Sequence, residues 1–375
     1  MKLIRTAKLR LDISTQDIKP TIEAYTKAYN FVCQIGFNPF DINGVSLHHK
    51  TYQTTRQYLP SQLAISARMK ATESLKSVKA LRKKKQHISC PQSKQCSVRL
   101  DKNSYTLWLE SRKVSILTID GRKKFSLNIP EYFERYLDWK HTSANLLIDS
   151  KGRVFLHVVF EKEVSDIEPT GNLVGCDRGV KKLAVTSDNR FFGGGKVKQV
   201  SDRYQRLRSQ LQSKKTRSAK RHLTKVRGKE RRFRKDANHC ISKQIVSKLQ
   251  SGDTLVFEDL TGIRKRTNNW RKAQRKEVNR WNFFQLEWII KYKAESKGIN
   301  IVYVDARYTS QRCSRCGHIK RANRVCQSLF SCKKCGFQLN ADLNASRNIC
   351  LKYLDATGYP DRAVVNQPIV PSLSG

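Results

Sequence analysis

Two spacings of apolar residues divide the first part of the chain. Residues 2–12 alternate apolar and basic side chains, which predicts an opening strand. Over residues 16–35 the spacing becomes helical, and Asp17 stands near the expected N-terminal cap. The apolar face of this helix is made by Ile18, Ile22, Tyr25, Tyr29 and Val32. A second helix is expected over residues 61–85, with Ser61 at its cap.

From residue 97 to residue 164, apolar residues recur at every second position. The pattern predicts six short strands, at residues 97–100, 105–109, 114–119, 125–129, 145–148 and 154–160. Several short strands at close spacing are typical of a small barrel. We expect the opening strand to join it, so that one domain comprises residues 1–15 and 90–165, and a helical insertion comprises residues 16–89.

The second half of the chain, after a linker at about residues 163–171, mixes strands with helices. Its pattern predicts three strands, a basic helical stretch, a strand, a helix, a strand and a final helix. These segments lie at residues 173–176, 182–186, 190–192, 201–250, 254–260, 281–297, 299–304 and 339–351. Asn340 is placed to cap the final helix, with Asp342 in its first turn. This is the element order of the RNase H-like nuclease fold, so we expect an α+β multidomain protein with an α/β domain here.

Positive charge dominates the composition of this 375-residue chain. It has 74 Lys and Arg against 31 Asp and Glu, a formal net charge of +43, which attracts polyanions such as nucleic acids. Residues 202–236 hold 15 basic residues against three acids, and residues 264–280 hold eight against one Glu. A solvated hairpin of charged helices is the alternative interpretation of the first stretch. The candidate nucleic-acid contacts are Arg217, Lys220, Arg221, Arg231, Arg232, Arg264, Lys265, Arg266, Trp270, Arg271 and Arg347.

The apolar segments also bear on where the protein acts. No run of 18 or more apolar residues occurs, so the sequence predicts no membrane span and no membrane partner. The N-terminus has too short an apolar core for a secretory signal. Eleven cysteines without such a signal favour a reducing compartment, where thiols bind metal or lie buried. We therefore expect a cytoplasmic, nucleoid-associated prokaryotic protein.

Four cysteines have the spacing of a structural zinc site. Cys313 and Cys316 form one Cys-x2-Cys-Gly motif, and Cys332 and Cys335 form a second one after fifteen intervening residues. Zn2+ favours four thiolates in tetrahedral geometry, and such a closed site leaves no position open for catalysis. We expect one Zn2+ here, with each glycine letting backbone amides turn toward sulfur. Cys326 lies outside both pairs and is not expected to be a ligand.

Three acids that are far apart in the sequence stand at the ends of elements that the expected fold brings together. Asp177 follows a strand, Glu258 ends another, and Asp342 begins the final helix. Each alone is more commonly a turn or cap residue. Together they suit two Mg2+ ions, one activating water and one stabilising the leaving oxygen of a phosphodiester. The sequence therefore predicts a Mg2+-dependent phosphodiesterase, with Asp259 and Asp305 as weaker candidate acids.

Five motifs of the second half resemble those of TnpB, a family of insertion-sequence-encoded proteins with a RuvC-like nuclease. They lie at residues 175–179, 257–260, 308–317, 332–336 and 341–349, and they are specific in combination. The first half is similar only in arrangement. The resemblance implies a wedge-like β-barrel with an inserted helical recognition domain in that half. It further implies a RuvC-like nuclease at residues 166–308 and 339–355, a target-binding zinc ribbon at 309–338 and a flexible tail at 356–375.

The resemblance also implies an activity and partners. It implies an RNA-guided DNA endonuclease of a transposable element, with Asp177, Glu258 and Asp342 as catalytic residues. The implied partners are a guide RNA derived from the element's end, bound by one protein monomer, and target double-stranded DNA cut beside a short motif. Three alternatives stay open: a compact type V CRISPR effector, a DNA transposase, and a nucleic-acid-binding regulator that never cuts.

Overall fold

The computed structural model describes residues 2–38, 40–165, 168–169, 171–263, 275 and 283–358. The chain divides into two compact units, Met1–Ser165 and Asp166–Gly375. None of the helices among the described residues is long and apolar enough to cross a membrane.

The first unit is built on a seven-stranded antiparallel sheet that forms a near-closed barrel. Strand β1 pairs with β7 along most of its length but with β5 only at its end, through Arg10 and Leu11. The strand order is β2-β6-β7-β1-β5-β4-β3. The bounds are β1 (Lys2–Leu11), β2 (Val98–Leu100), β3 (Tyr105–Trp108), β4 (Lys113–Thr118), β5 (Gly121–Asn128), β6 (Lys140–Ile148) and β7 (Val154–Glu163).

Three helices, α1 (Lys19–Phe37), α2 (Gly44–Arg56) and α3 (Ser61–Lys83), lie between β1 and β2 in the sequence, and the short α4 (Glu131–Glu134) follows β5. The predicted apolar face of α1 is buried, as expected. Asp17 stands next to Ile18, the N-cap of α1, as expected, and it lies in a 3-10 turn capped by Ser14. The cap predicted for α3 is wrong, because the N-cap is Pro60 and Ser61 is already helical.

The second unit has a five-stranded mixed sheet in the order β10-β9-β8-β11-β12. Strands β8, β11 and β12 are parallel, whereas β8, β9 and β10 are joined as antiparallel hairpins. The strand bounds are β8 (Leu173–Asp177), β9 (Lys182–Thr186), β10 (Arg190–Gly193), β11 (Thr254–Asp259) and β12 (Asn300–Asp305). The helices are α5 (Gly195–Ser213), α6 (Arg217–Ser247), α9 (Phe283–Glu295) and α10 (Ala341–Thr357), with the small strands β13 (Leu329–Ser331) and β14 (Gln338–Asn340) before α10. The predicted order of elements is confirmed.

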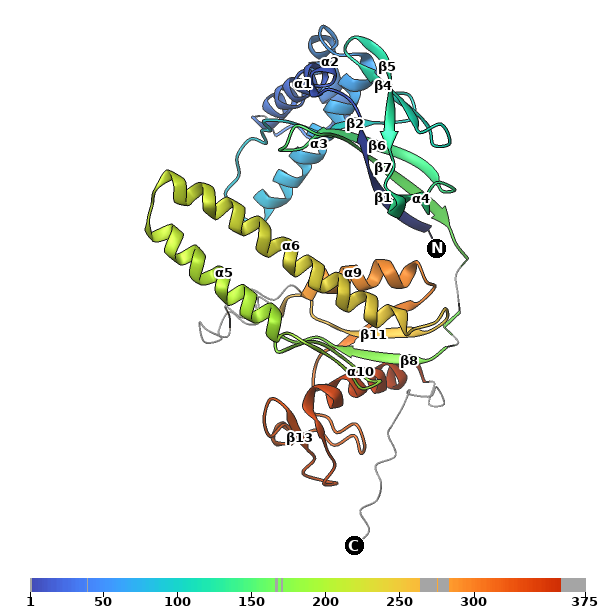
Figure 1. Ribbon diagram of the computed structural model, residues 1–375, viewed down its shortest axis with the longest axis vertical. Helices are drawn as coiled ribbons and strands as arrows, with labels where there is room; N and C mark the ends of the chain where they lie inside the picture. The colour runs from blue at the N-terminus through green and yellow to red at the C-terminus, as the bar shows by residue number, and fades with distance from the viewer. Residues whose placement is uncertain are drawn as a thin grey trace. The chain divides into compact units, whose positions relative to one another are not determined.

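Helices cover both faces of this sheet (Figure 1). On one face, side chains such as Cys176 and Phe257 belong to the core that also contains Leu286 and Ile290 of α9. On the other face, Leu173 and Val256 pack against Ile349, Cys350 and Leu354 of α10. Because side chains alternate along a strand, residues 173, 175 and 177 of β8 point toward α10, as do residues 256 and 258 of β11.

Helix α10 packs against the backbone of β8 at Gly175. A Cβ added there would lie 2.1 Å from the carbonyl oxygen of Ser346 and 3.0 Å from Sγ of Cys350. Both atoms belong to α10, and no L-residue with a side chain fits without moving the helix. Glycine therefore sets how closely the final helix approaches the strand.

We expect Gly175→Ala to destabilise the protein by about 1–3 kcal/mol, the usual cost of overpacking a filled core. Urea denaturation of the purified protein would measure this. Gly193→Ala is the matched control, because a Cβ at that strand residue meets no heavy atom within 4 Å. Equal stability of the two variants would contradict the close helix–strand contact.

The basic stretch between β10 and β11 forms two helices, α5 and α6, which lie side by side as a hairpin (Figure 1). One of its few acids is buried between them. Glu230 is 4% exposed, and its carboxylate lies 2.7 Å from Arg208 of α5 and 2.7 Å from Arg234 of α6. This charge cluster lets two highly basic helices pack together and leaves most of their other cations at the surface.

Candidate active site and cysteine cluster

Asp177 and Glu258 lie side by side at the carboxyl ends of two parallel strands. Cys176 of β8 is in register with Phe257 of β11, so the next residues on each strand are at the same level. Neighbouring strands are about 4.8 Å apart, and both side chains point to the face covered by α10. Glu258 is buried and Asp177 is half-buried. The sheet thus places two carboxylates together in a partly dehydrated position.

The first turn of α10 places Asp342 at the same edge. As predicted, Asn340 caps this helix, since its side-chain oxygen accepts hydrogen bonds from the backbone N–H groups of Asp342 (3.1 Å) and Leu343 (3.2 Å). Ser346, one turn further along, is the residue whose carbonyl approaches Gly175 of β8. Asp342 therefore lies one turn back along the helix, on the side of Asp177.

Burial raises the pKa of all three acids, and their charges interact at Asp177. Burial raises the pKa of Asp177 well above its ordinary value, and the charges of Glu258 and Asp342 raise it further. Burial also raises the pKa of Glu258, although a hydrogen bond from Thr309 opposes this. Burial likewise raises the pKa of Asp342. Closely placed carboxylates hold protons unless a cation offsets their charge, so this cluster suits a hard cation.

Arg324 supplies one compensating charge that the sequence analysis did not identify. It lies between the two cysteine pairs, and its Nη2 is 3.3 Å from Oδ1 of Asp342. Its charge lowers the pKa of Asp177, Glu258 and Asp342 alike, against the larger effect of burial. One guanidinium thus contacts Asp342 and acts on the other two acids through its charge.

We expect Asp177→Asn to raise the melting temperature of the protein in buffer without added divalent cations. The folded-state pKa of Asp177 is raised, so its ionisation opposes folding, and stability falls as pH rises from the ordinary aspartate pKa toward the raised value. Asparagine removes this cost, and each kcal/mol recovered is worth about 2–4 °C in a domain of this size. Thermal melts at pH 5 and pH 8 would measure the gain, which should be larger at pH 8.

The exposed Asp305→Asn is the control for that experiment, and it should show no such gain. A wild-type protein at least as stable as Asp177→Asn at pH 8 would contradict the electrostatic conflict.

The four predicted zinc ligands come together. The Sγ atoms of Cys313, Cys316, Cys332 and Cys335 all lie within 4.8 Å of one another. Gly317 and Gly336 have φ angles of 72° and 70°, the left-handed conformation that lets each Cys-x2-Cys turn close. Cys326 is exposed and is not part of the group. Within the described residues, this is the one group of three or more potential ligands close enough to hold a metal ion. Asp177, Glu258 and Asp342 would therefore have to move closer together to bind one.

Buried amides attach the cysteine module, residues 309–338, to the helix that carries Asp342. The Nδ2 of Asn344 donates to the carbonyl of Arg312 (2.8 Å), and its oxygen accepts from the N–H of Ser314 (3.1 Å). Nδ2 of Asn348 donates to the carbonyls of Thr309 (2.8 Å) and Arg312 (2.6 Å). Both asparagines are fully buried. These bonds hold the start of the module against α10, and Arg324 of the same module contacts Asp342.

The other predicted site residues differ in how exposed their side chains are, and some lie outside the described residues. On α6, the side chains of Arg217, Lys220, Arg221, Arg231 and Arg232 are all exposed. Arg264, Lys265, Arg266, Trp270 and Arg271 lie outside the described residues. Arg347 is only 7% exposed, and its Nη2 donates to Oδ1 of Asn189 (3.4 Å), so it is less accessible to phosphate than the α6 cations. Asp259 and Asp305 are exposed and point away from the face that carries Glu258.

Comparison with known families gives two matches within this chain. A family described as a probable transposase matches residues 157–262, and the family described as the Cas12f1-like TNB domain matches residues 283–349. The first contains Asp177 and Glu258, and the second contains Asp342 and the four cysteines.

Three curated proteins illustrate the sequence relationships. The CRISPR-associated endodeoxyribonuclease Cas12f1 of Sulfoacidibacillus thermotolerans is 39% identical over 36% of this chain and 30% of its own length. A TnpB-like protein of Methanocaldococcus jannaschii is 29% identical over 65% of this chain and 81% of its own. The putative RNA-guided DNA endonuclease InsQ of Escherichia coli is 30% identical over 53% of this chain and 54% of its own. The chain thus spans less than two thirds of the first and third proteins.

Among solved structures, a Cas12f1–sgRNA–target DNA complex is similar in fold. Its protein superposes with a TM-score of 0.64 at 16% identity, covering 90% of this chain and 82% of that one. At this identity the match shows a shared mixed α/β fold that extends over nearly the whole chain.

Proposed function

We propose that this chain, which is a relative of the TnpB proteins, is an RNA-guided DNA endonuclease that uses divalent metal ions. The observation that carries the proposal is the convergence of Asp177, Glu258 and Asp342 on one face of the second sheet. Two further facts support it. Related proteins are named endonucleases, and the chain carries a formal charge of +43.

In this proposal the second unit is a RuvC-like nuclease formed by residues 166–308 and 339–355, with a zinc ribbon inserted at residues 309–338. Four thiolates within 4.8 Å of one another fit Zn2+, which would stiffen the ribbon. The first unit would be the wedge-like barrel with its inserted recognition helices, residues 16–89. Both assignments rest on the resemblance and on the positions of the elements.

The residues at the acidic cluster fit magnesium, because three carboxylates offer the oxygen ligands that a hard cation prefers. Bound Mg2+ would supply the activation of water and the stabilisation of the leaving oxygen. Asp177, Glu258 and Asp342 would hold the ions. Thr309 orients the carboxylate of Glu258 through its hydroxyl. Arg324, already next to Asp342, would pair with the phosphate of the DNA backbone.

The α5–α6 hairpin would contact the sugar–phosphate backbone of guide RNA or target DNA. Its exposed cations can pair with phosphates but carry no sequence information. In guided nucleases, base pairing supplies most of the sequence specificity, and the protein reads a short motif and the backbone shape. The guide RNA, from the element's end, and the target double-stranded DNA are therefore the proposed partners.

We expect Arg231→Ala and Arg232→Ala to weaken RNA binding and to lower the salt dependence of binding by about one unit of slope each. Filter binding of a fixed-length RNA at several salt concentrations would measure the slope. Arg231→Lys is the matched control, since it keeps the charge and should keep the slope. An unchanged slope in both alanine variants would show that this part of α6 contacts no phosphate.

The guided mechanism itself can be tested by purification. The protein should be isolated from cells that carry its flanking DNA, and any RNA that accompanies it should be sequenced. A single RNA species from that locus, able to direct cleavage of matching DNA, is the expected result. Cleavage by protein free of RNA would overturn guidance and leave the nuclease proposal standing.

A compact type V CRISPR effector is a second candidate, favoured by the 39% identity to Cas12f1 over 135 residues. Its chemistry would be the same, and only the origin of the guide would differ. A repeat array beside the coding sequence would favour this candidate, and its absence would favour the transposon context.

A further inference from the structure

We infer that Arg178 is a positioning residue, which fixes the two strand ends that carry Asp177 and Glu258. This inference rests on the proposed function, because it concerns how the proposed catalytic acids are held. It adds a role for a side chain that lies on the opposite face of the sheet from those acids.

Arg178 connects the two strands at the point where their pairing stops. The register between β8 and β11 ends at Cys176 and Phe257, one residue before both acids. Immediately beyond it, Nη2 of Arg178 donates a hydrogen bond to the backbone carbonyl of Glu258 (2.7 Å). One guanidinium therefore replaces the next bond of the ladder and links the residue after Asp177 directly to Glu258.

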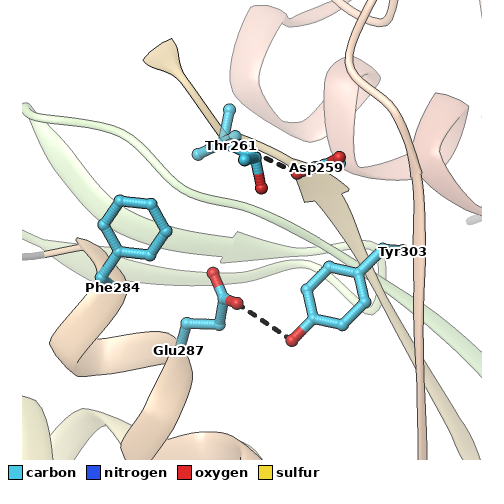
Figure 2. Close-up of a pocket in the computed structure, with 6 residues that line it drawn as sticks. Asp259, Thr261, Phe284, Glu287 and Tyr303 are labelled. Carbon is cyan, nitrogen blue, oxygen red and sulfur yellow. Dashed lines mark hydrogen bonds between the residues drawn. The ribbon is translucent and has the colours of Figure 1, made fainter. Parts of the chain in front are cut away.

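The position of Arg178 is set by its surroundings. Arg178 is 4% exposed, and its guanidinium lies over the ring of Phe257, 4.7 Å from the ring centre. Its Nη1 donates to the carboxylate of Glu287 on α9. The other oxygen of Glu287 accepts a hydrogen bond from the hydroxyl of Tyr303 on β12 (2.9 Å), as Figure 2 shows. A continuous polar chain thus runs from β12 through α9 to the backbone of Glu258.

Stability alone is a poor explanation for this arrangement. Burying an ion pair costs about as much as it returns, and apolar residues of similar size often serve as well. What the pair does provide is geometry, because the planar guanidinium donates in several fixed directions at once. Lysine would offer the charge without those directions.

The end of this hydrogen-bonded network at Tyr303 is accessible to solvent, so it can be changed by a mild substitution. Glu287 and Tyr303 line a cavity of about 290 Å3 together with Asp259, Leu260, Thr261 and Phe284 (Figure 2). Tyr303→Phe would remove one hydroxyl at this surface and leave the buried guanidinium in place. It is a mild variant of the same network.

The test measures Mn2+ binding to the purified full-length protein by the paramagnetic resonance signal of the free ion. Arg178→Met should weaken the binding that depends on Asp177 by about tenfold or more, the usual effect of losing a residue that orients metal ligands. The Mn2+ affinity of Arg178→Lys should lie between those of Arg178→Met and the wild type. Tyr303→Phe should weaken binding by a smaller factor and keeps the test valid if Arg178→Met does not fold.

Arg190→Met is the matched control. Arg190 also donates to one carboxylate, Asp188 (2.7 Å), and to one backbone carbonyl, that of Gln244 (2.9 Å), and neither of these partners lies on β8 or β11. It should lower the melting temperature and leave Mn2+ affinity unchanged. If folded Arg178→Met binds Mn2+ as tightly as the wild type does, the inference is wrong and the proposed function still stands. If Arg178→Met does not fold, wild-type affinity in Tyr303→Phe has the same meaning. Mn2+ binding unaffected by Asp177→Ala would overturn the proposed function as well.

Discussion

Replacing Glu258 with glutamine is expected to slow DNA cleavage by about 10³-fold or more, with little loss of nucleic-acid binding. The substitution keeps the shape of the side chain and its contact with Thr309, but it removes one of three negative charges that would hold the metal ions. Catalysis depends on those ions, whereas binding depends on basic surfaces elsewhere on the chain. The Glu258→Gln variant should therefore lose cleavage and keep nucleic-acid binding.

Cleavage rates of guide-matched DNA, with binding measured in parallel, would check this result. Asp259→Asn is the matched control, since Asp259 is the next residue of β11, is exposed and points to the opposite face. It should cut at the wild-type rate. Comparable losses in both variants would mean that the acidic face toward α10 is not the reaction centre.

Replacing Cys332 with serine is expected to abolish zinc binding and unfold residues 309–338. Structural zinc sites contribute roughly 10–16 kcal/mol of apparent binding free energy in small metal-dependent modules, more than this short segment can supply by packing. Arg324 should then no longer be held beside Asp342, and cleavage should be lost with the fold of the module.

Zinc content by mass spectrometry and limited proteolysis of the module would measure the loss. Cys326→Ser is the matched control, because Cys326 lies in the same module, is exposed and stands outside the ligand group. It should keep one zinc ion per chain and resist protease as the wild type does. Retention of zinc by Cys332→Ser would contradict the four-thiolate site.

Much of this arrangement follows from local patterns in the sequence. The strand bearing Asp177 and the helix bearing Asp342 were predictable because apolar spacing and an Asn340 cap are short-range signals. Helix α2 was not predicted, since its buried face is Leu47, Thr51 and Thr55, and two threonines give no apolar period. The break between α5 and α6 was not placed, because charged residues dominate both helices, but their hairpin is the arrangement given as the alternative for this stretch.

The contributions of Arg324 and Arg178 could not be read from spacing. Arg324 meets Asp342 only because the cysteine module folds back on α10, and Arg178 meets Glu287, which is 109 residues away in the sequence. Each depends on a tertiary contact between segments that no short-range signal connects. Among 74 basic residues, nothing local distinguishes these two.

The asparagines of α10 have a consequence for the newly made protein. Asn344 and Asn348 bond the cysteine module to the helix that begins with Asp342, so unfolding of the module would break these bonds. In the proposed enzyme, a freshly synthesised chain would gain the ability to cut only after it had acquired zinc. A cell short of that metal would then accumulate the proposed nuclease in a form that cannot cut.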